Sequence, residues 1–443
     1  MKKIVVIGGG TFSHVRNHLA LAAPAFGHTA TVIAQTSLDK WGETADVRLY
    51  LTKMADPFDL FGEQSDPIVT NEDVEELAKE WVEDYDVKVV FFNAAICDFK
   101  GNIADNNLKP TQSGKYEERL KTSTGNQLMI LEPYDKIVGR IRKTRKDIFL
   151  VAFKTTCGAS EDEMYIAGLD MLKRNSCNLV LCNDTSTRKN MIITPEEARY
   201  HVTDDRDLII RELVEMAYLR SQLTFTRSTV IDGERVGWGD KRIPATLRAI
   251  VHWCIMQGAY KEFNGATVGH FAVKLNNNEF LSSIRKTNFN NIEEHGMVRI
   301  VTDGPDNVMA FGAKPSVGGQ SQRIVFHDHP EYDCIVHFHC PLRPDHTDDI
   351  PVVSQREYEC GSHQCGENTS KGLGKFGNLS CVMLDNHGPN IVFHHSIDAT
   401  EVMSFINNNF DLTKKTGGLV STPTLTELSK KLEYDNKEPV TEG

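Results

Sequence analysis

The sequence predicts two α/β domains, the first built on a doubly wound parallel sheet and the second on an α/β/α arrangement. Three observations lead to this expectation. The chain has 443 residues, more than one hydrophobic core usually serves, so two domains of roughly 200 residues are expected. Hydrophobic residues make up 40% and charged residues 25%, an ordinary globular composition. In both halves, apolar runs of strand length alternate with stretches of helical periodicity.

The first half opens with an apolar strand, Lys2–Gly10, that runs into three glycines. We then expect helices and strands to alternate up to about residue 221. The strand at 87–92, VKVVFF, is apolar apart from Lys88, as is typical of a parallel sheet buried on both faces. The expected helices are 19–26, 71–85, 161–174 and 207–218, and the further strands are 31–34, 87–92, 147–153 and 178–182.

Glycines cluster and periodicity is lost between residues 221 and 244, which indicates a linker or a long surface loop. A helix at 245–257 begins the second domain. The expected elements after it are strands at 267–275, 298–302, 334–339, 380–384 and 391–393 and a helix at 398–408. We therefore predict domains at 1–221 and 222–414, with a polar tail at 415–443 that serves as an arm or lid or is mobile.

Charge and cysteine usage exclude several classes of protein. The net charge of -12 repels nucleic acid and anionic membranes. Ten cysteines are scattered along the chain without the dense spacing of a small secreted scaffold. The start MKKIVVIGGG has too short an apolar run for an export signal, so we expect a cytoplasmic protein without a nucleic-acid or membrane partner.

Three histidines in the second half suggest a metal centre. His337 and His339 follow the apolar run 334–336, and the two-residue repeat of a strand directs both imidazoles to the same side. His387 occupies a strand-to-turn junction, where Gly388 permits a close backbone approach. A lone histidine is more often an ordinary surface or core residue. Three histidines with this spacing leave a coordination position for substrate, as catalytic zinc sites do.

The stretch from Lys314 to His339, KPSVGGQSQRIVFHDHPEYDCIVHFH, resembles the class II aldolase/adducin family in its Pro-Ser step, helix and HxH strand. His387 then falls where that family has its third metal ligand. The resemblance covers roughly residues 245–410. The family includes sugar-phosphate aldolases, pentulose-phosphate epimerases, decarboxylating lyases and the non-catalytic adducin heads.

The same resemblance implies a substrate site that binds an anion. Residues 269–270 stand where the family has a Gly-Asn step, residues 282–286 where it has a Thr-Pro-Ser-Gly turn, and residues 315–316 where it has a paired serine. Basic side chains in the second segment would supply positive charge. The implied substrate-binding residues are Gly269, His270, Ser282, Ser283, Arg285, Lys286 and Ser316.

One departure concerns proton transfer. The acid/base glutamate of the family corresponds here to Gly318, so another group must act as the acid or base. The run YECGSHQCGE is interpreted as an active-site loop, with Glu359, His363 and Glu367 as the candidate catalytic residues. Two alternatives stay open for this run: a glycine-bearing loop without a catalytic role, and a second Cys/His metal site.

Glycines at the end of the first strand suggest a phosphate-binding turn before a helix amino terminus. Gly9, Gly10 and Thr11 are the residues of this turn. A dinucleotide motif would need a third glycine where Ser13 stands, and no acidic residue ends the second expected strand. NAD is therefore disfavoured.

Four separated segments resemble phosphopantothenate-cysteine ligase, the synthetase half of phosphopantothenoylcysteine decarboxylase/synthetase. They are GGTFSHVRNH, NAAICDF, ERLKTSTGNQLMILEPYDKI, and VAFKTT with CNDTS, all within residues 1–220. The resemblance implies a Rossmann-like fold that binds a nucleotide. It implies Asp98 and Phe153 near the nucleotide, Lys121 on phosphate, Asn17 at an acyl intermediate and Asn183 at the pocket floor.

The sequence thus predicts a metal-dependent lyase that forms a metal-bound enediolate from a small phosphorylated or carboxylated carbonyl compound, fused to a ligase-like nucleotide-binding domain. Zinc is the expected metal, with manganese or cobalt as alternatives. CTP or another nucleotide is expected at the first domain. An epimerase or decarboxylase, a bifunctional enzyme and a non-catalytic adducin-like module remain alternatives. The family resemblance implies a homo-oligomer, a tetramer.

Overall fold

The computed structural model describes residues 1–56, 67–316 and 319–417, which form a mixed α/β structure in two compact units. Unit 1 comprises Met1–Ala159, Gly168–Ile193 and His201–Ser221. Unit 2 comprises Ser160–Ala167, Thr194–Tyr200 and the chain from Gln222 onward. The α/β fold class expected from the sequence is confirmed. Within the described ranges, no helix is long and apolar enough to cross a membrane.

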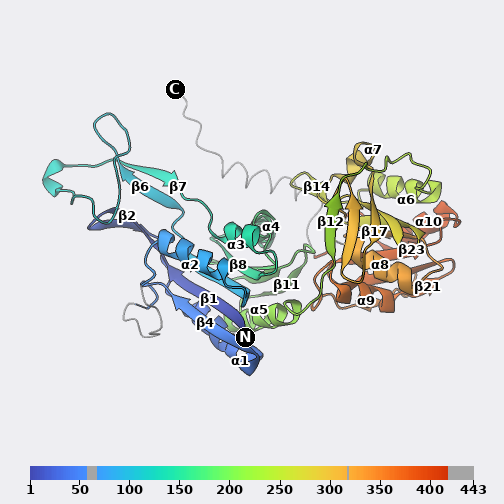
Figure 1. Ribbon diagram of the computed structural model, residues 1–443, viewed down its shortest axis with the longest axis horizontal. Coiled ribbons are helices and arrows are strands. Elements are labelled where there is room, and N and C mark those ends of the chain that lie inside the picture. The colour runs from blue at the N-terminus through green and yellow to red at the C-terminus, as the bar shows by residue number, and fades with distance from the viewer. Residues whose placement is uncertain (57–66, 317–318, 418–443) are drawn as a thin grey trace. The chain divides into compact units, whose positions relative to one another are not determined.

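Unit 1 is built on a seven-stranded sheet with the order β11-β10-β9-β8-β5-β1-β4 (Figure 1). The five strands from β9 to β4 run parallel, and β10 is antiparallel to β9. The strands are β1 Lys2–Gly10, β4 Ala45–Leu51, β5 Val87–Ala95, β8 Phe149–Thr156, β9 Leu179–Asp184, β10 Asn190–Ile193 and β11 Arg199–Thr203.

Helices cover both faces of this sheet. α1 (His28–Trp41) packs on α5 (Arg206–Arg220), and α2 (Asn71–Glu83) packs on α3 (Val138–Thr144), with the two pairs on opposite faces in Figure 1. α4 (Glu161–Asn175) connects β8 to β9. The chain passes from β1 to β4 on one side and then to β5 on the other. The carboxyl ends of β1 and β5 therefore form a topological switch point, the usual ligand crevice of such sheets.

The expected helix at 19–26 and strand at 31–34 are both wrong. β2 (Phe12–Arg16) and β3 (Leu19–Ala22) form a hairpin, and α1 covers 31–34. Ala30, Ile33 and Ala34 are buried at helical spacing, so packing on the sheet overrides the strand preference of the β-branched residues there. A second ribbon pairs β6 (Phe99–Ile103) with β7 (Met129–Pro133).

Unit 2 contains a ten-stranded, mostly antiparallel sheet with the order β12-β18-β17-β16-β15-β19-β23-β22-β20, and β21 pairs with β22. Its strands are β12 Arg227–Ile231, β15 His270–Asn276, β16 Glu279–Ser283, β17 Met297–Thr302, β18 Asn307–Phe311, β19 Cys334–His337, β20 Val352–Val353, β21 Gly374–Phe376, β22 Leu379–Leu384 and β23 Gly388–Phe393. β13 (Glu262–Phe263) and β14 (Ala266–Thr267) form a short separate pair.

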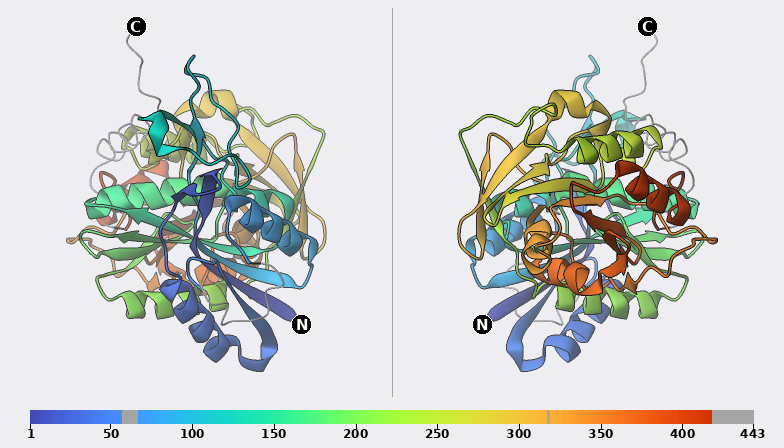
Figure 2. Two further views of the ribbon diagram at one scale, coloured as in Figure 1. Left: turned by 90° about the vertical axis from the view of Figure 1, so that its left-hand side faces the viewer. Right: turned by 90° about the vertical axis from the view of Figure 1, so that its right-hand side faces the viewer.

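Two helix layers enclose the second sheet. α6 (Ala245–Met256) packs on α10 (Ala399–Asn409), and α8 (Gly319–Asp328) packs on α9 (His363–Gly372), as the right-hand view of Figure 2 shows. Strand residues alternate between the layers, as the two-residue repeat requires. Phe271 and Val336 belong to the core beneath α6 and α10, whereas Ala272 and Ile335 belong to the core beneath α8. α7 (Ile292–His295) is a short helix before β17.

Two expectations for the second half are wrong. The segment 221–244 contains β12, which pairs in parallel with β18 at the sheet edge, so it is not a structureless linker. The presumed loop at 358–367 ends in α9, which begins at His363 and is capped by the Ser362 hydroxyl accepting from Cys365 N. Residues 418–443 of the expected tail lie outside the described ranges.

Candidate functional site

Three buried histidine side chains converge at one end of two neighbouring strands. β19 ends at His337, His339 follows two residues later, and His387 immediately precedes β23. β19 and β23 are antiparallel, with His337 opposite Asn390, so the end of one strand meets the start of the other. Ring centroids are 5.0 Å apart for His337 and His339, and 4.6 Å for each pair that includes His387.

The donor atoms of this trio suit a tetrahedral metal ion. His337 Nε2 and His387 Nε2 are 3.2 Å apart. Nitrogens bound to one zinc ion at about 2.1 Å lie about 3.4 Å from each other. His337 Nδ1 donates to the Pro389 carbonyl oxygen at 2.7 Å, which directs Nε2 toward the other rings. Burial lowers the pKa of His337 to about 4, so the imidazole is neutral, the form that binds metal.

A fourth histidine lies against the trio. His270 of β15 is paired with His337 in the sheet, and their rings stack at 4.7 Å. Its Nδ1 accepts from the Gln322 amide, so the neutral ring carries its proton on Nε2. Burial, with the neighbouring His337, holds the pKa of His270 well below its usual range. Gln322 was not identified from the sequence, because its contact with His270 arises only when α8 packs on the sheet.

Further polar side chains come from β16, from Ser316 and from α8. Ser283 Oγ and Ser316 Oγ are 2.7 Å apart, so two of the expected substrate-binding segments meet. Ser282 Oγ and Gln322 Oε1 are buried and have no hydrogen-bond partner within the described part of the chain. A ligand oxygen or N–H group could satisfy them. Arg285 is exposed at the end of β16.

Backbone conformation at two expected substrate-binding residues is unusual. Gly269 has a φ of 111°, and an added Cβ would lie 2.5 Å from the His337 carbonyl oxygen. Only glycine permits this approach to the metal-binding strand. Lys286 is exposed and has a φ of 59°, which turns the chain sharply after β16.

The three candidate acid/base residues lie in the first half of α9 and in the turn before it. His363 Nε2 lies 2.6 Å from Thr226 Oγ1. Glu367 is exposed on α9 and pairs with Lys371 at 3.5 Å. Glu359 is buried just before α9, where its carbonyl oxygen accepts from Ser362 N. Their catalytic assignment therefore stays a prediction. Gly318, the position of the family glutamate, lies outside the described residues.

The segment after α10 lies beside the trio. Thr416 N donates to the His339 carbonyl oxygen at 3.0 Å, and Thr416 Oγ1 donates to the His387 carbonyl oxygen at 2.7 Å. The first residues of the expected tail thus fix the backbone of two candidate ligands. This contribution is not evident in the sequence, since it depends on the chain returning to the site.

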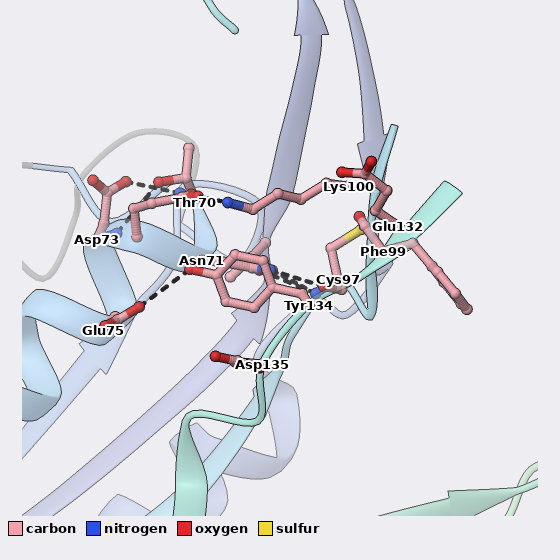
Figure 3. A network of polar contacts seen from close by, with 12 residues as sticks. Thr70, Asn71, Asp73, Glu75, Cys97, Phe99, Lys100, Glu132, Tyr134 and Asp135 are labelled. Atoms are coloured by element: carbon pink, nitrogen blue, oxygen red, sulfur yellow. Dashed lines mark hydrogen bonds and ion pairs between the residues drawn. The ribbon is translucent and has the colours of Figure 1, made fainter. Parts of the chain in front are cut away.

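In unit 1, polar contacts fix the turn between β5 and β6, and Figure 3 shows those made by Cys97. Asn71, the first residue of α2, donates from Nδ2 to the Cys97 carbonyl oxygen at 2.8 Å and accepts from Cys97 N at 3.1 Å. Tyr134 Oη donates to Glu75 at 3.2 Å, and burial raises the pKa of Tyr134 to about 12. These contacts hold Asp98 just beyond β5, at the carboxyl edge of the sheet.

Several expected nucleotide-site residues share that carboxyl edge. Gly9 and Gly10 end β1, Phe153 lies in the second half of β8, and Asn183 lies near the end of β9. The Asn183 side chain accepts from Thr155 Oγ1 at 3.3 Å. Asp98 forms an ion pair with Lys136. Parallel strands bring these positions together although they are far apart in the sequence.

The remaining residues of this predicted site are placed differently. Thr11 is fully buried, and its hydroxyl contacts Asn71 and accepts from Cys97 N. β2 follows the glycine turn, so the expected helix amino terminus is absent at this place. Asn17 is exposed in the β2–β3 turn and donates from Nδ2 to the Lys115 carbonyl oxygen. Lys121 is exposed before a short 3-10 turn, Thr122–Thr124.

Comparison with known proteins gives partial similarities. No family model matches the chain. The coenzyme A biosynthesis bifunctional protein CoaBC of Thermococcus kodakarensis is 27% identical over 184 residues, which cover 41% of this chain and 41% of that protein. The chain therefore spans less than half the length of this curated relative.

Similarity to solved structures involves two kinds of fold. The DNA/pantothenate metabolism flavoprotein from Streptococcus pneumoniae has a TM-score of 0.40 and 22% identity, covering 48% of this chain and 97% of that chain. L-fuculose 1-phosphate aldolase has a TM-score of 0.27 and 15% identity, covering 44% of this chain and 100% of that chain. Both TM-scores lie below 0.5, and neither likeness carries a functional inference.

Proposed function

We propose that unit 2 is a divalent-metal-dependent lyase of the class II aldolase type, acting on a small phosphorylated or carboxylated carbonyl compound. The convergence of three buried imidazoles carries this proposal. Their donor atoms all lie within 4.8 Å of one another, and zinc, manganese and cobalt all accept imidazole ligands. When bound, the ion would act as a Lewis acid toward the carbonyl oxygen of the substrate.

The chain's own residues would orient the substrate around this centre. His337 keeps the orientation imposed by the Pro389 carbonyl oxygen. His270 offers a neutral N–H donor to a substrate oxygen, because its other ring nitrogen already accepts from Gln322. The hydroxyls of Ser283 and Ser316 form a polar pair that can bind an anionic substituent. Arg285 and Lys286 lie two and three residues after Ser283 and add positive charge.

Isotope exchange tests the reaction class without knowledge of the full substrate. Purified protein reconstituted with zinc is incubated in D₂O with dihydroxyacetone phosphate or hydroxypyruvate, and proton NMR follows the C–H groups next to the carbonyl. An aldolase-type site removes such a proton to form an enediolate and returns a deuteron from solvent. We expect zinc-dependent loss of the proton signal, abolished by His337→Ala with His339→Ala.

The outcomes separate the alternatives. Absence of exchange with either probe, in protein that binds zinc, would favour a non-catalytic module of the adducin kind. Exchange that is equal in the wild type and the double variant would exclude the histidine trio as its origin. Exchange followed by analysis of products from sugar phosphates distinguishes cleavage from epimerisation and decarboxylation.

For unit 1, the second proposal is a ligase-like nucleotide-binding domain that takes CTP or another nucleotide. The switch point of its sheet supports this, since Asp98 and the ends of β1, β8 and β9 lie at the same edge. The 27% identical relative named for coenzyme A biosynthesis also supports it. Calorimetric titration with CTP and ATP tests the proposal. We expect saturable binding that Asp98→Asn weakens, and no binding of either nucleotide would contradict it.

A further inference from the structure

We propose a second transition-metal site, formed by Asp333, His394 and His395 at the opposite end of the two strands that carry the histidine trio. Asp333 directly precedes β19, and His394 and His395 directly follow β23. Because these strands are antiparallel, with Cys334 opposite Phe393, the start of one lies beside the end of the other. The proposed ligand is a divalent first-row cation that prefers imidazole, with zinc as the reference.

The side chains of the second cluster already converge. His395 Nδ1 contacts Asp333 Oδ2, and His394 Nε2 lies 3.6 Å from the same oxygen. The two rings are 4.4 Å apart with an interplanar angle of 34°. All three donor atoms lie within 4.8 Å of one another. Donors of a tetrahedral zinc site lie about 3.4 Å apart, so small side-chain rotations suffice to bring them to one ion.

The arrangement is more specific than a surface ion pair. β23 ends at Phe393, and the turn that begins at His394 lets both rings face one carboxylate. His395 N donates to Asp333 Oδ1 at 2.7 Å, so the backbone orients the carboxylate. Ser396 also fixes the His394 ring, since its backbone N–H donates to His394 Nδ1 at 3.3 Å and its Oγ lies 2.8 Å from the same nitrogen.

The surroundings favour a cation. A cavity of about 440 Å³ lies next to His394 and is lined by the carboxylates of Glu331, Asp398 and Glu401, with Lys375 as the basic residue. The excess of carboxylates attracts positive charge. Both histidine side chains are about half exposed, at 49% and 50%, so an ion and its water ligands can reach them.

The two clusters cannot share one ion. Four residue steps separate Asp333 from His337, which corresponds to about 13 Å along a strand. Metal–ligand bonds are about 2 Å long. The second site is therefore independent of the proposed lyase centre, and its failure would leave that proposal intact.

Equilibrium dialysis of the full chain against zinc, followed by elemental analysis, tests the inference. Protein freed of metal with a chelator is compared with His394→Asn/His395→Asn and with His337→Ala/His339→Ala. We expect two equivalents of zinc in the wild type and one in each double variant. His327→Asn is the matched control, since His327 pairs with Asp328 on the surface at 3.0 Å and should leave two equivalents.

The count also separates the two proposals. If His394→Asn/His395→Asn binds as much zinc as the wild type, the second site is excluded and the cluster is an ion pair only. If His337→Ala/His339→Ala binds as much as the wild type, the lyase centre is excluded instead. Asp333→Asn provides a milder variant in case the double variant fails to fold. It should also lose one equivalent, and undiminished zinc binding by this folded variant would overturn the inference.

Discussion

Gly269 holds the chain close to the metal-binding strand. Its φ of 111° is accessible chiefly to glycine, and an added Cβ would lie 2.5 Å from the His337 carbonyl oxygen. Both the torsion angle and the contact are therefore unfavourable for any other residue. The position combines backbone strain with a steric limit beside a candidate ligand.

Replacement of Gly269 by alanine should destabilise unit 2 by about 2 kcal/mol or more. The physical reason is that the strand carrying His337 must shift to relieve the contact. Urea unfolding measures the change, and zinc binding should weaken together with stability. Gly258→Ala is the matched control, because Gly258 has a φ of 72° but nothing within 4 Å of an added Cβ. Equal losses in the two variants would contradict the role of the contact.

For single residues, the sequence reveals the candidate metal ligands more readily than the groups that position them. His337 and His339 follow a recognisable apolar strand, and His387 precedes a glycine. Among the groups that position them are the Pro389 carbonyl oxygen, which accepts from His337, and Thr416, whose N–H and hydroxyl donate to the carbonyl oxygens of His339 and His387. Backbone acceptors carry no sequence signal, and such contacts depend on the tertiary fold.

Among the secondary-structure elements, β9 ends at Asp184, whose buried carboxylate fixes the turns on either side of it by hydrogen bonds. Asp184 accepts backbone N–H groups from Thr187, Ala159 and Gly158 and the hydroxyl of Thr156. These hydrogen bonds, led by the one from Thr187, hold the pKa of Asp184 well below its usual range. They join the β8–α4 turn to the β9–β10 turn.

The depressed pKa of Asp184 predicts a pH dependence of unfolding. The carboxylate stabilises the fold fully above the unfolded-state pKa of about 3.9, and this contribution is lost as pH falls below that value. Thermal unfolding of the wild type should therefore show a midpoint that falls from about pH 5 to pH 3. Asp184→Asn should lower the midpoint at neutral pH and flatten this decline.

Asp39→Asn is the comparison for that measurement, since Asp39 is exposed on α1, where its carboxylate accepts from the Gln35 amide at 3.3 Å. It should leave the pH profile as in the wild type. An unchanged profile in Asp184→Asn as well would show that the hydrogen-bonded carboxylate does not control acid unfolding.

Several helices were predictable from their repeat, although α1 was not, and short strands defined by pairing with other segments were missed. α2, α4, α5, α6 and α10 carry the expected periodicity and match the predicted helices closely. β2 and β3 form a two-stranded hairpin, and β12 pairs with β18 about eighty residues away. Short strands of this kind need a partner before their pattern has meaning, because a few residues show no distinct period.

For the molecule as a whole, no single boundary in the sequence separates the two units, because each unit consists of several segments of the chain. Unit 2 takes residues 160–167 and 194–200 in addition to the chain after 222. Within it, Lys415 Nζ lies 2.6 Å from Glu197 and 2.9 Å from Tyr165 Oη. The Lys415 and Glu197 side chains are 2% and 1% exposed, so this ion pair is almost completely removed from water.

Breaking that ion pair should be costly. Glu197→Gln or Lys415→Met leaves a buried charge without its counterion and should destabilise unit 2 by about 3–5 kcal/mol. The double variant should recover a large part of the loss, because no unbalanced charge remains. Denaturant unfolding of the four proteins measures the coupling. Lys414→Met is the control, since Lys414 is 60% exposed in its pair with Asp411 and should change stability by at most about 1 kcal/mol.

Additive effects of the two single changes would contradict a coupled ion pair. Recovery in the double variant would instead establish that residues from well before position 222 stabilise the unit that carries the histidine trio. A fragment beginning at Gln222 should then be less stable than unit 2 in the full chain.

Metal content tests whether His337, His339 and His387 bind a metal ion, as the claim of a lyase centre in unit 2 requires. Elemental analysis is made on protein carrying His394→Asn and His395→Asn, so that the second cluster cannot contribute, with and without His337→Ala and His339→Ala. We predict one equivalent of transition metal per chain in the first protein and none in the second. Equal metal content in the two proteins, or none in either after incubation with zinc, would contradict the claim.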